Sequence, residues 1–353
     1  MGINGNPGGD RFSVGLGLTN DCNLACKHCY RDTDRIDRLT LEDVRRICDS
    51  VPVRSVNLGT GENGLHPDFR AILRYLRDRG VAIALTSNGY SAAVLNDEEL
   101  GWLTDLEFSL DFATEAEQDS WRGPGNWRLV FEQTARAHKV GVAVTFIAVM
   151  MRTNYDRLSD LGALAAKYGA NFRVNVYQAV KTDAFSLDYD KFWTGFQLLF
   201  ESRPLAVCSE PIVRALLGFD APSSGCGRTT IRVTPRGEVL PCVYWGKRKL
   251  GLAELERWGP AIVNSPAFRE LDLIPQFCRN CRFMQVCRGG CPSRRLLRRE
   301  LEMPDEFCPF ANGKPLPQFA SRAGSRRQFS KASSACTTVF STESDAERSQ
   351  TTR

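Results

Sequence analysis

The chain has 353 residues, of which 42% are hydrophobic and 25% are charged, an ordinary composition for a globular protein of one large or two smaller domains. It contains no apolar run long enough to span a membrane and begins with no secretory signal, so we expect a cytoplasmic protein. The net charge is only +5, and much of it lies after residue 313, which argues against a large nucleic-acid footprint.

Strands and helices alternate along the first two thirds of the chain. The predicted strands are Arg11–Leu18, Val53–Leu58, Val81–Thr86, Leu106–Leu110, Val142–Met150 and Phe172–Tyr177. The predicted helices are Leu41–Val51, Phe69–Arg79, Trp127–Lys139, Tyr155–Tyr168 and Asp188–Glu201. This alternation predicts parallel βα units, and six of them predict an α/β fold, a partial (β/α)6 barrel over residues 11–205. Functional residues of such folds collect at the carboxyl ends of the strands.

The pattern changes after this predicted barrel. Residues 206–312 form short elements with many cysteines, so we expect a small second domain there. Within it, Ile231–Thr234 and Glu238–Cys242 flank a Pro-Arg-Gly turn and predict a β-hairpin. The composition of residues 313–353 predicts a disordered basic tail, and residues 1–10 a flexible N-terminus.

Thirteen cysteines occur in a long chain without an export signal, which favours metal binding over disulfides. The first group, Cys22, Cys26 and Cys29, directly follows the first predicted strand. Three thiolates can hold three irons of a [4Fe–4S] cluster and leave the fourth iron open, whereas electron carriers use four cysteines. A zinc site with His28 as fourth ligand is an alternative, but the neighbouring Cys29 restricts where His28 can point. A chance group of buried cysteines is the other alternative.

A glycine-rich segment, Gly59–Gly64, follows the second predicted strand and matches the dinucleotide fingerprint G-x-G-x-x-G. That interpretation requires an acidic residue about twenty positions later. The chain has Thr86, Ser87 and Asn88 there instead, and the glycines follow the second strand rather than the first. The cysteine group therefore favours a different cofactor.

The spacing C-x3-C-x2-C followed by an aromatic residue, here Tyr30, resembles the signature of radical S-adenosylmethionine (SAM) enzymes. The resemblance implies an open iron that chelates SAM, and reductive SAM cleavage to a 5′-deoxyadenosyl radical that takes a hydrogen from the substrate. It also implies that the family's Gly-Gly-Glu-Pro segment corresponds to Thr60, Gly61, Glu62 and Asn63, with Glu62 on the SAM amino group. Thr60 and Asn63 depart from that pattern, which affects the expected shape of the loop.

Polar residues at other strand ends resemble further SAM-binding segments of the family. They are Ser87 and Asn88 after the third strand and Ser109 and Asp111 at the fourth. Asn154, after the fifth strand, and Asn175, in the sixth, are expected to face the same cavity. The alternative for each is a turn or a helix cap, where Ser, Asp and Asn are common.

The second cysteine group exceeds what one four-coordinate site needs, and two zinc ribbons are the generic alternative. Its spacing resembles the SPASM extension of radical SAM enzymes, which carries two auxiliary [4Fe–4S] clusters. The resemblance assigns the distal cluster to Cys278, Cys281, Cys287 and Cys308, and the proximal cluster to Cys226, Cys242 and Cys291. The fourth proximal ligand is either Cys208 or absent, which would leave an open iron.

Two further features have ordinary interpretations. Cys48 is expected in the core of the first helix. A run of arginines, Arg294, Arg295, Arg298 and Arg299, is expected to form a solvated helix face rather than an RNA-binding surface.

The resemblance implies an oxidoreductase that modifies a peptide or protein. The alternative substrate is a tetrapyrrole, a metal–pterin or another small-molecule cofactor. An expected partner is a reductase such as flavodoxin or ferredoxin. Peptide modifiers of the family often carry an N-terminal leader-binding domain, but here the first strand begins near residue 11, so either a separate leader-binding protein supplies that function or the substrate is not leader-guided.

Overall fold

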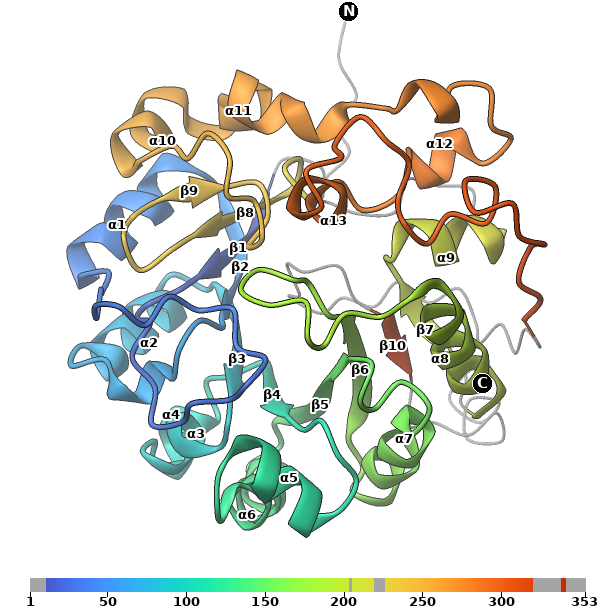
Figure 1. Ribbon diagram of the computed structural model, residues 1–353. Coiled ribbons are helices and arrows are strands. Elements are labelled where there is room, and N and C mark those ends of the chain that lie inside the picture. Colours follow the sequence, from blue (N-terminus) through green and yellow to red (C-terminus); the bar gives the residue numbers. More distant parts are fainter. Residues whose placement is uncertain (1–10, 203–204, 219–225, 320–337, 341–353) are drawn as a thin grey trace, which may run out of the picture.

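The computed structural model describes residues 11–202, 205–218, 226–319 and 338–340. The ten strands of the described residues form one sheet in the order β7-β10-β6-β5-β4-β3-β2-β1-β8-β9. Within it, strands β1 to β6 are parallel to one another. The helices lie outside this curved row of strands (Figure 1). The prediction of a parallel α/β fold of six βα units is confirmed.

The parallel strands are β1 (Phe12–Leu16), β2 (Val53–Leu58), β3 (Ala82–Ser87), β4 (Asp105–Ser109), β5 (Ala143–Met150) and β6 (Asn171–Val176). The helices around them are α1 (Leu41–Ser50), α2 (Phe69–Asp78), α3 (Tyr90–Ala93), α4 (Asp97–Leu100), α5 (Glu115–Arg122), α6 (Asn126–Lys139), α7 (Leu158–Lys167) and α8 (Tyr189–Ser202). The short helices α3, α4 and α5 are additions to the predicted elements.

Local sequence explains why these helices begin and pack where they do. Thr40 caps α1 and exchanges hydrogen bonds with Asp43, a capping box. In α2 the buried side chains recur at helical spacing, so one face lies against the sheet; they are Phe69, Ile72, Leu73 and Leu76. Cys48 is buried in the core on α1, as expected.

The cysteine-rich segment continues the barrel sheet. Strand β8 (Thr230–Val233) pairs in parallel with β1, and β9 (Val239–Leu240) pairs antiparallel with β8, which confirms the predicted hairpin. The remaining helices are α9 (Pro211–Leu216), α10 (Leu252–Trp258), α11 (Pro266–Arg269), α12 (Met284–Cys287) and α13 (Pro292–Leu297). The described residues also contain four 3-10 helices. Three lie in the cysteine-rich segment, at Gly259–Asn264, Glu270–Asp272 and Gln276–Cys278, and one follows β2, at Asn63–Leu65.

The far edge of the sheet differs from expectation. Strand β10 (Thr338–Phe340) lies between β6 and β7 (Leu205–Cys208) and is antiparallel to both. These three residues fall within the segment predicted as a disordered tail, and they form a strand because two neighbouring edges supply backbone partners. The rest of the predicted tail beyond residue 319, and the predicted flexible N-terminus, lie outside the described residues.

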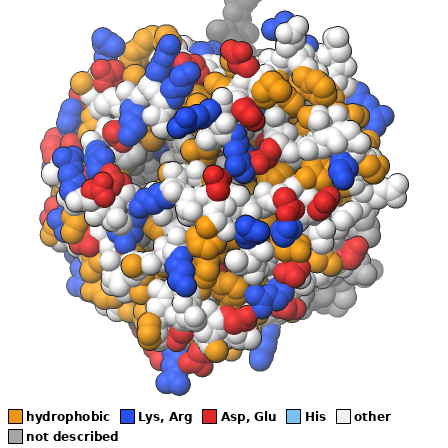
Figure 2. All heavy atoms as spheres, viewed as in Figure 1, with side chains coloured by type: hydrophobic (Ala, Val, Ile, Leu, Met, Phe, Trp, Pro, Cys, Tyr) orange, Lys and Arg blue, Asp and Glu red, His pale blue; other side chains and the backbone are white. Residues whose placement is uncertain are grey.

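The surface shows no single-sign charge field in the view of Figure 2, where Lys and Arg alternate with Asp and Glu. Among the described residues, no helix has the length and apolar character needed to cross a membrane.

Candidate functional site

One cavity collects residues from the carboxyl ends of all six parallel strands. Its lining includes the three cysteines of the first group together with Tyr30, Thr60, Gly61, Glu62, Ser87, Asn88, Ser109 and Asn175. Parallel strands end at the same edge of the sheet, so segments far apart in sequence meet here. Of the residues predicted for this cavity, Asp111 and Asn154 are absent from its lining.

The loop that carries the cysteines is stabilised by hydrogen bonds between its own side chains and its own backbone. The Asn20 side chain donates to the carbonyls of Asp32 (3.0 Å) and Arg35 (2.8 Å) and accepts from the Asp37 amide (2.7 Å). Arg31 donates to the carbonyls of Asn20 (2.6 Å) and Leu24 (2.7 Å). These bonds fix the path of the chain on both sides of the cysteines.

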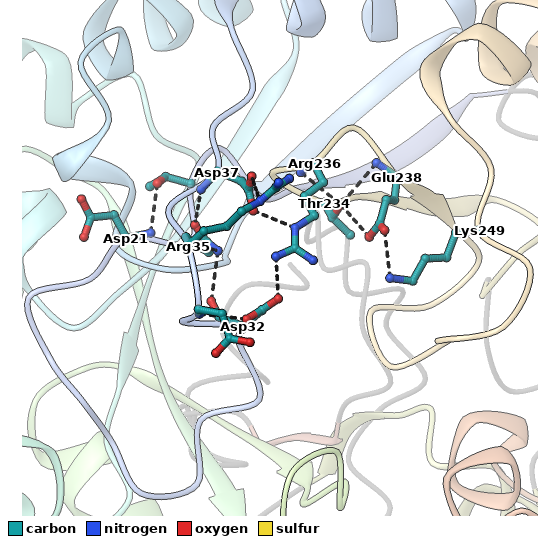
Figure 3. Close-up of polar contacts among 11 residues, drawn as sticks. Asp21, Asp32, Arg35, Asp37, Thr234, Arg236, Glu238 and Lys249 are labelled. Carbon is teal, nitrogen blue, oxygen red and sulfur yellow. Dashed lines mark hydrogen bonds and ion pairs between the residues drawn. The ribbon is translucent and has the colours of Figure 1, made fainter.

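The β8–β9 hairpin contacts the same loop from outside (Figure 3). Arg236, at the hairpin turn, donates to Asp32 (2.5 Å) and Asp37 (2.7 Å). Glu238, two residues after Arg236 in the same hairpin, pairs with Lys249 (2.9 Å). The cysteine-rich segment therefore braces the loop of the first cysteine group.

The first cysteine group fits a [4Fe–4S] cluster with one open iron. Cys22, Cys26 and Cys29 face one cavity, and no fourth cysteine of the described residues lines it. Burial raises the pKa of the Cys22 thiol to about 11 and also raises that of Cys26, so iron would have to displace these protons on binding.

His28 also lines the cavity, but both ring nitrogens already have neighbours. Its Nδ1 accepts from Trp121 Nε1 (2.8 Å), and its Nε2 lies 3.6 Å from Asp111 Oδ2. Among the described residues, no three His, Cys, Asp or Glu side chains converge tightly enough for a single metal ion, the arrangement that zinc requires. Ligands of a four-iron cluster surround a larger body and are spaced more widely.

The loop after β2 approaches the cysteine loop so closely that only glycine fits at one position. Gly61 has φ +65°, and a Cβ there would lie 2.4 Å from the carbonyl oxygens of Thr19 and Asp21. The next amide, of Glu62, donates to the Asp21 carbonyl (2.7 Å). Thr60 Oγ1 lies 3.4 Å from the Tyr30 hydroxyl.

The Glu62 carboxylate is buried and receives several donors. Its Oε1 accepts from Ser87 Oγ (2.5 Å), from the Ser91 amide (2.7 Å) and from Ser91 Oγ, while Oε2 accepts from the Asn88 amide (2.9 Å). Burial raises the pKa of the Glu62 carboxyl, although these hydrogen bonds favour the charged form. Oε2 retains capacity for another donor.

Asn88 links the third strand to the cysteine loop. Its Nδ2 donates to Asn23 Oδ1 (2.8 Å), and Asn126 Nδ2 donates to its carbonyl (2.7 Å). Ser109 lines the cavity, and its carbonyl accepts from Gln118 (3.2 Å). Asn154 instead bonds to the carbonyls of Asp111 and Val149, which matches the turn-forming alternative.

Asp111 lies behind the cavity wall and holds an arginine in that wall. Its Oδ2 lies 2.7 Å from Arg122 Nη2, and its Oδ1 accepts from the Val149 amide (2.9 Å). Arg122 Nη1 in turn approaches Cys26 Sγ (3.8 Å). In this geometry Asp111 positions Arg122 and does not itself line the cavity.

Residues 16–164 match the family model described as the Radical SAM superfamily. These residues therefore form a radical SAM domain. This domain contains the three cavity cysteines and the loop of Glu62.

Similarity to known proteins extends beyond that domain. "Mycofactocin maturase MftC" of Mycobacterium ulcerans is 28% identical over 335 residues, covering 84% of this chain and 88% of the relative. Two solved structures share the fold: anSMEcpe with bound AdoMet (TM-score 0.66, 15% identity, 85% and 95% coverage) and Streptococcus suis SuiB bound to its precursor peptide SuiA (TM-score 0.64, 16% identity, 85% and 76% coverage).

The second cysteine group contains two sets of neighbouring cysteines. Cys278, Cys281, Cys287 and Cys308 line one apolar cavity beside α12. Cys242 hydrogen-bonds to Cys226 and to Ser293. Burial raises the pKa of the Cys291 thiol, and the nearby Cys242 contributes to the same shift. These two sets correspond to the ones that the family resemblance implied.

Cys208 is not brought to either set. It is buried on β7, its sulfur lies 3.4 Å from Thr338 Oγ1, and its nearest charged neighbours are Glu210 and Arg214. Burial raises its pKa to about 12. Its position suits a core cysteine.

The arginine run on α13 is partly buried, which corrects the expected solvated face. Arg294 is 3% exposed and pairs with Glu210 (2.8 Å) and Asp305 (2.6 Å). Arg295 is 2% exposed and donates to the carbonyls of Leu273 (3.0 Å) and Leu301. Both guanidinium groups hold loops of the cysteine-rich segment together, since buried charge requires such partners.

Sequence reasoning missed several residues that line the cavity, among them Arg122, Arg173, Arg232 and Tyr244. Arg173 pairs with buried Glu107 (2.6 Å) inside the barrel. The Tyr244 ring packs edge-to-face on Tyr30, with centroids 5.3 Å apart. The available signals were the charged residues within otherwise apolar strands β6 and β8.

Proposed function

We propose that this chain is a radical SAM maturase that modifies a peptide or protein substrate. One observation carries the proposal: three cysteines and the Glu62 loop share a single cavity at the strand ends. The similarity to a maturase over most of both chains supports it.

In this proposal Cys22, Cys26 and Cys29 hold the [4Fe–4S] cluster. When bound, that cluster supplies the electron that cleaves SAM to a 5′-deoxyadenosyl radical. Glu62 Oε2 accepts from the SAM amino group, the step for which its remaining acceptor capacity is suited. The other SAM contacts come from Tyr30, Thr60, Gly61, Ser87, Asn88 and Ser109, all of which line the cavity.

The cysteine-rich segment, residues 206–312, is proposed to form a SPASM domain next to a core of residues 11–205. Cys278, Cys281, Cys287 and Cys308 would hold the distal auxiliary cluster, and Cys226, Cys242 and Cys291 the proximal one. Because Cys208 packs against Thr338, we favour three protein ligands for the proximal cluster. A reductase such as flavodoxin or ferredoxin would supply electrons, and a separate protein would bind a substrate leader.

A peptide substrate is favoured over a tetrapyrrole or metal–pterin because the mycofactocin maturase is 28% identical to this chain and one structure of the same fold holds a precursor peptide. An "AdoMet-dependent heme synthase" of Methanosarcina barkeri is also similar, at 24% identity, and supports the alternative. A small-molecule cofactor as substrate is the alternative, and product analysis distinguishes the two.

The proposal is tested by iron content after anaerobic reconstitution. Wild type should hold about twelve irons, from about four per cluster, and the variant with Cys22, Cys26 and Cys29 all changed to Ala should hold about eight. Cys278→Ala should lose the distal cluster yet still cleave SAM, because that cluster acts after the radical forms. A wild-type protein that held zinc and no iron would overturn the proposal.

A further inference from the structure

Arg232 extends from the cysteine-rich segment into the barrel cavity. It lies on β8 directly opposite Gly15 of β1, and its side chain crosses the face of that glycine. A Cβ at Gly15 would lie 2.0 Å from Arg232 Nη1 and 2.2 Å from its Cδ, so only glycine leaves room for this arrangement. The guanidinium is therefore accommodated within the cavity wall.

The charge of Arg232 is uncompensated, unlike that of the other arginines in the lining. Arg31 bonds to two backbone carbonyls, Arg122 pairs with Asp111 and Arg173 pairs with Glu107. Within the described parts of the chain, Arg232 has neither an ion pair nor a hydrogen bond. The one carboxylate in this lining, that of Glu62, already accepts hydrogen bonds from Ser87 on β3 and from Ser91 on α3.

The surroundings of Arg232 are suited to an anionic organic group. Its positive charge lowers the pKa of both Tyr30 and Tyr244, against the stronger effect of burial, so the guanidinium lies near both phenols. Gln178 lines the same cavity, is 8% exposed, and its Oε1 has no hydrogen-bond partner in the described structure. Buried polar atoms without partners are rare in folded proteins, and a ligand can supply the missing partner.

We propose that Arg232 anchors a carboxylate of the substrate and that Gln178 Oε1 accepts from an N–H group of the same substrate. This inference rests on the proposed function in placing the substrate in the cavity. A guanidinium presents two parallel donors that match a carboxylate. Arg232 and Glu62 lie on opposite sides of β1, on β8 and after β2, which separates this subsite from the proposed SAM amino-group contact.

The test compares two probes on the reconstituted holoenzyme in the presence of SAM: N-acetyl-Ala-Ala-Ala as the free acid and as its C-terminal amide. Anaerobic calorimetry measures the dissociation constant of each. Wild type should bind the acid about tenfold or more tightly than the amide, the effect of one charge-assisted hydrogen-bonded pair. Arg232→Gln should abolish this preference, and Arg232→Lys should restore part of it.

Arg54→Gln is the matched control, since Arg54 is an exposed arginine on β2 and should leave the preference intact. Iron content of each variant shows that the protein is folded. The proposal is overturned if wild type binds neither probe, or binds both equally, or if Arg232→Gln keeps the preference. It is also overturned if Arg232→Gln weakens SAM binding tenfold, because the arginine then serves the carboxylate of SAM. SAM cleavage is measured separately. Failure of the Arg232 proposal is therefore distinguishable from failure of the proposed function, which would show as loss of SAM cleavage by the wild type.

Discussion

Replacing Arg294 by Leu is the sharpest test of how the cysteine-rich segment is held. Arg294 lies between Glu210, before α9, and Asp305, in the loop that leads to Cys308. Asp305 also accepts from the Cys291 amide (2.8 Å), so the same ion pair supports residues beside both sets of cysteines. The Arg294→Leu change removes the cation and leaves the two carboxylates.

The expected cost follows from the burial of all three groups. Side-chain exposures are 4% for Arg294, 6% for Glu210 and 0% for Asp305. Removing one partner of a buried ion pair costs about 3–5 kcal/mol, because the other charges stay buried without compensation. For a domain of this size that corresponds to a fall of roughly 10 °C in the unfolding midpoint.

Thermal unfolding of the reconstituted protein, followed by circular dichroism, measures this effect. The control is Arg228→Leu, which breaks the 2.7 Å pair with Asp272. Arg228 is 41% exposed, and such surface pairs contribute about 0–1 kcal/mol, so its midpoint should fall by no more than about 3 °C. If Arg294→Leu unfolded within about 2 °C of wild type, the buried ion-pair argument would be refuted.

Three further outcomes are expected. Glu62→Gln should weaken SAM binding about tenfold or more while iron content stays at the wild-type level, because a charge-assisted bond is lost; calorimetry showing normal affinity would contradict the placement of Glu62. Cys208→Ser should retain wild-type iron content by elemental analysis, because Cys208 contacts Thr338 and neither auxiliary set; loss of about four irons would show that it is a ligand. In metal-free protein, Cys22 should react with iodoacetamide about a hundredfold more slowly at pH 8 than a thiol of pKa 9.0, and the rate should rise toward pH 11, because burial raises its pKa to about 11; a rate equal to that of an exposed thiol would falsify this.

The sequence was most informative where chemistry depends on local spacing. Cys22, Cys26 and Cys29 lie within one loop, so their convergence could be predicted without the fold. The strands and longer helices were also predictable, since apolar periodicity reflects burial on one face. The short helices α3, α4 and α5 lack a period long enough to detect.

Features that depend on contacts distant in sequence were not predictable. The burial of Arg294 depends on Glu210 and Asp305, which the fold brings to α13 from outside that helix. Strand β10 requires the edges of β6 and β7, so its composition alone indicated a tail. The role of Asp111 likewise depends on Arg122, eleven positions later on α5, whose side chain returns to the strand end.

The most direct test of the account is the release of 5′-deoxyadenosine by anaerobically reconstituted enzyme given SAM and a reductant. The wild type should release 5′-deoxyadenosine slowly even without substrate, because SAM held beside the cluster makes electron transfer an intramolecular step. The variant with Cys22, Cys26 and Cys29 changed to Ala should release none. Release by that triple variant at the wild-type rate, or no release by a wild-type protein that holds its full complement of iron, would contradict the account.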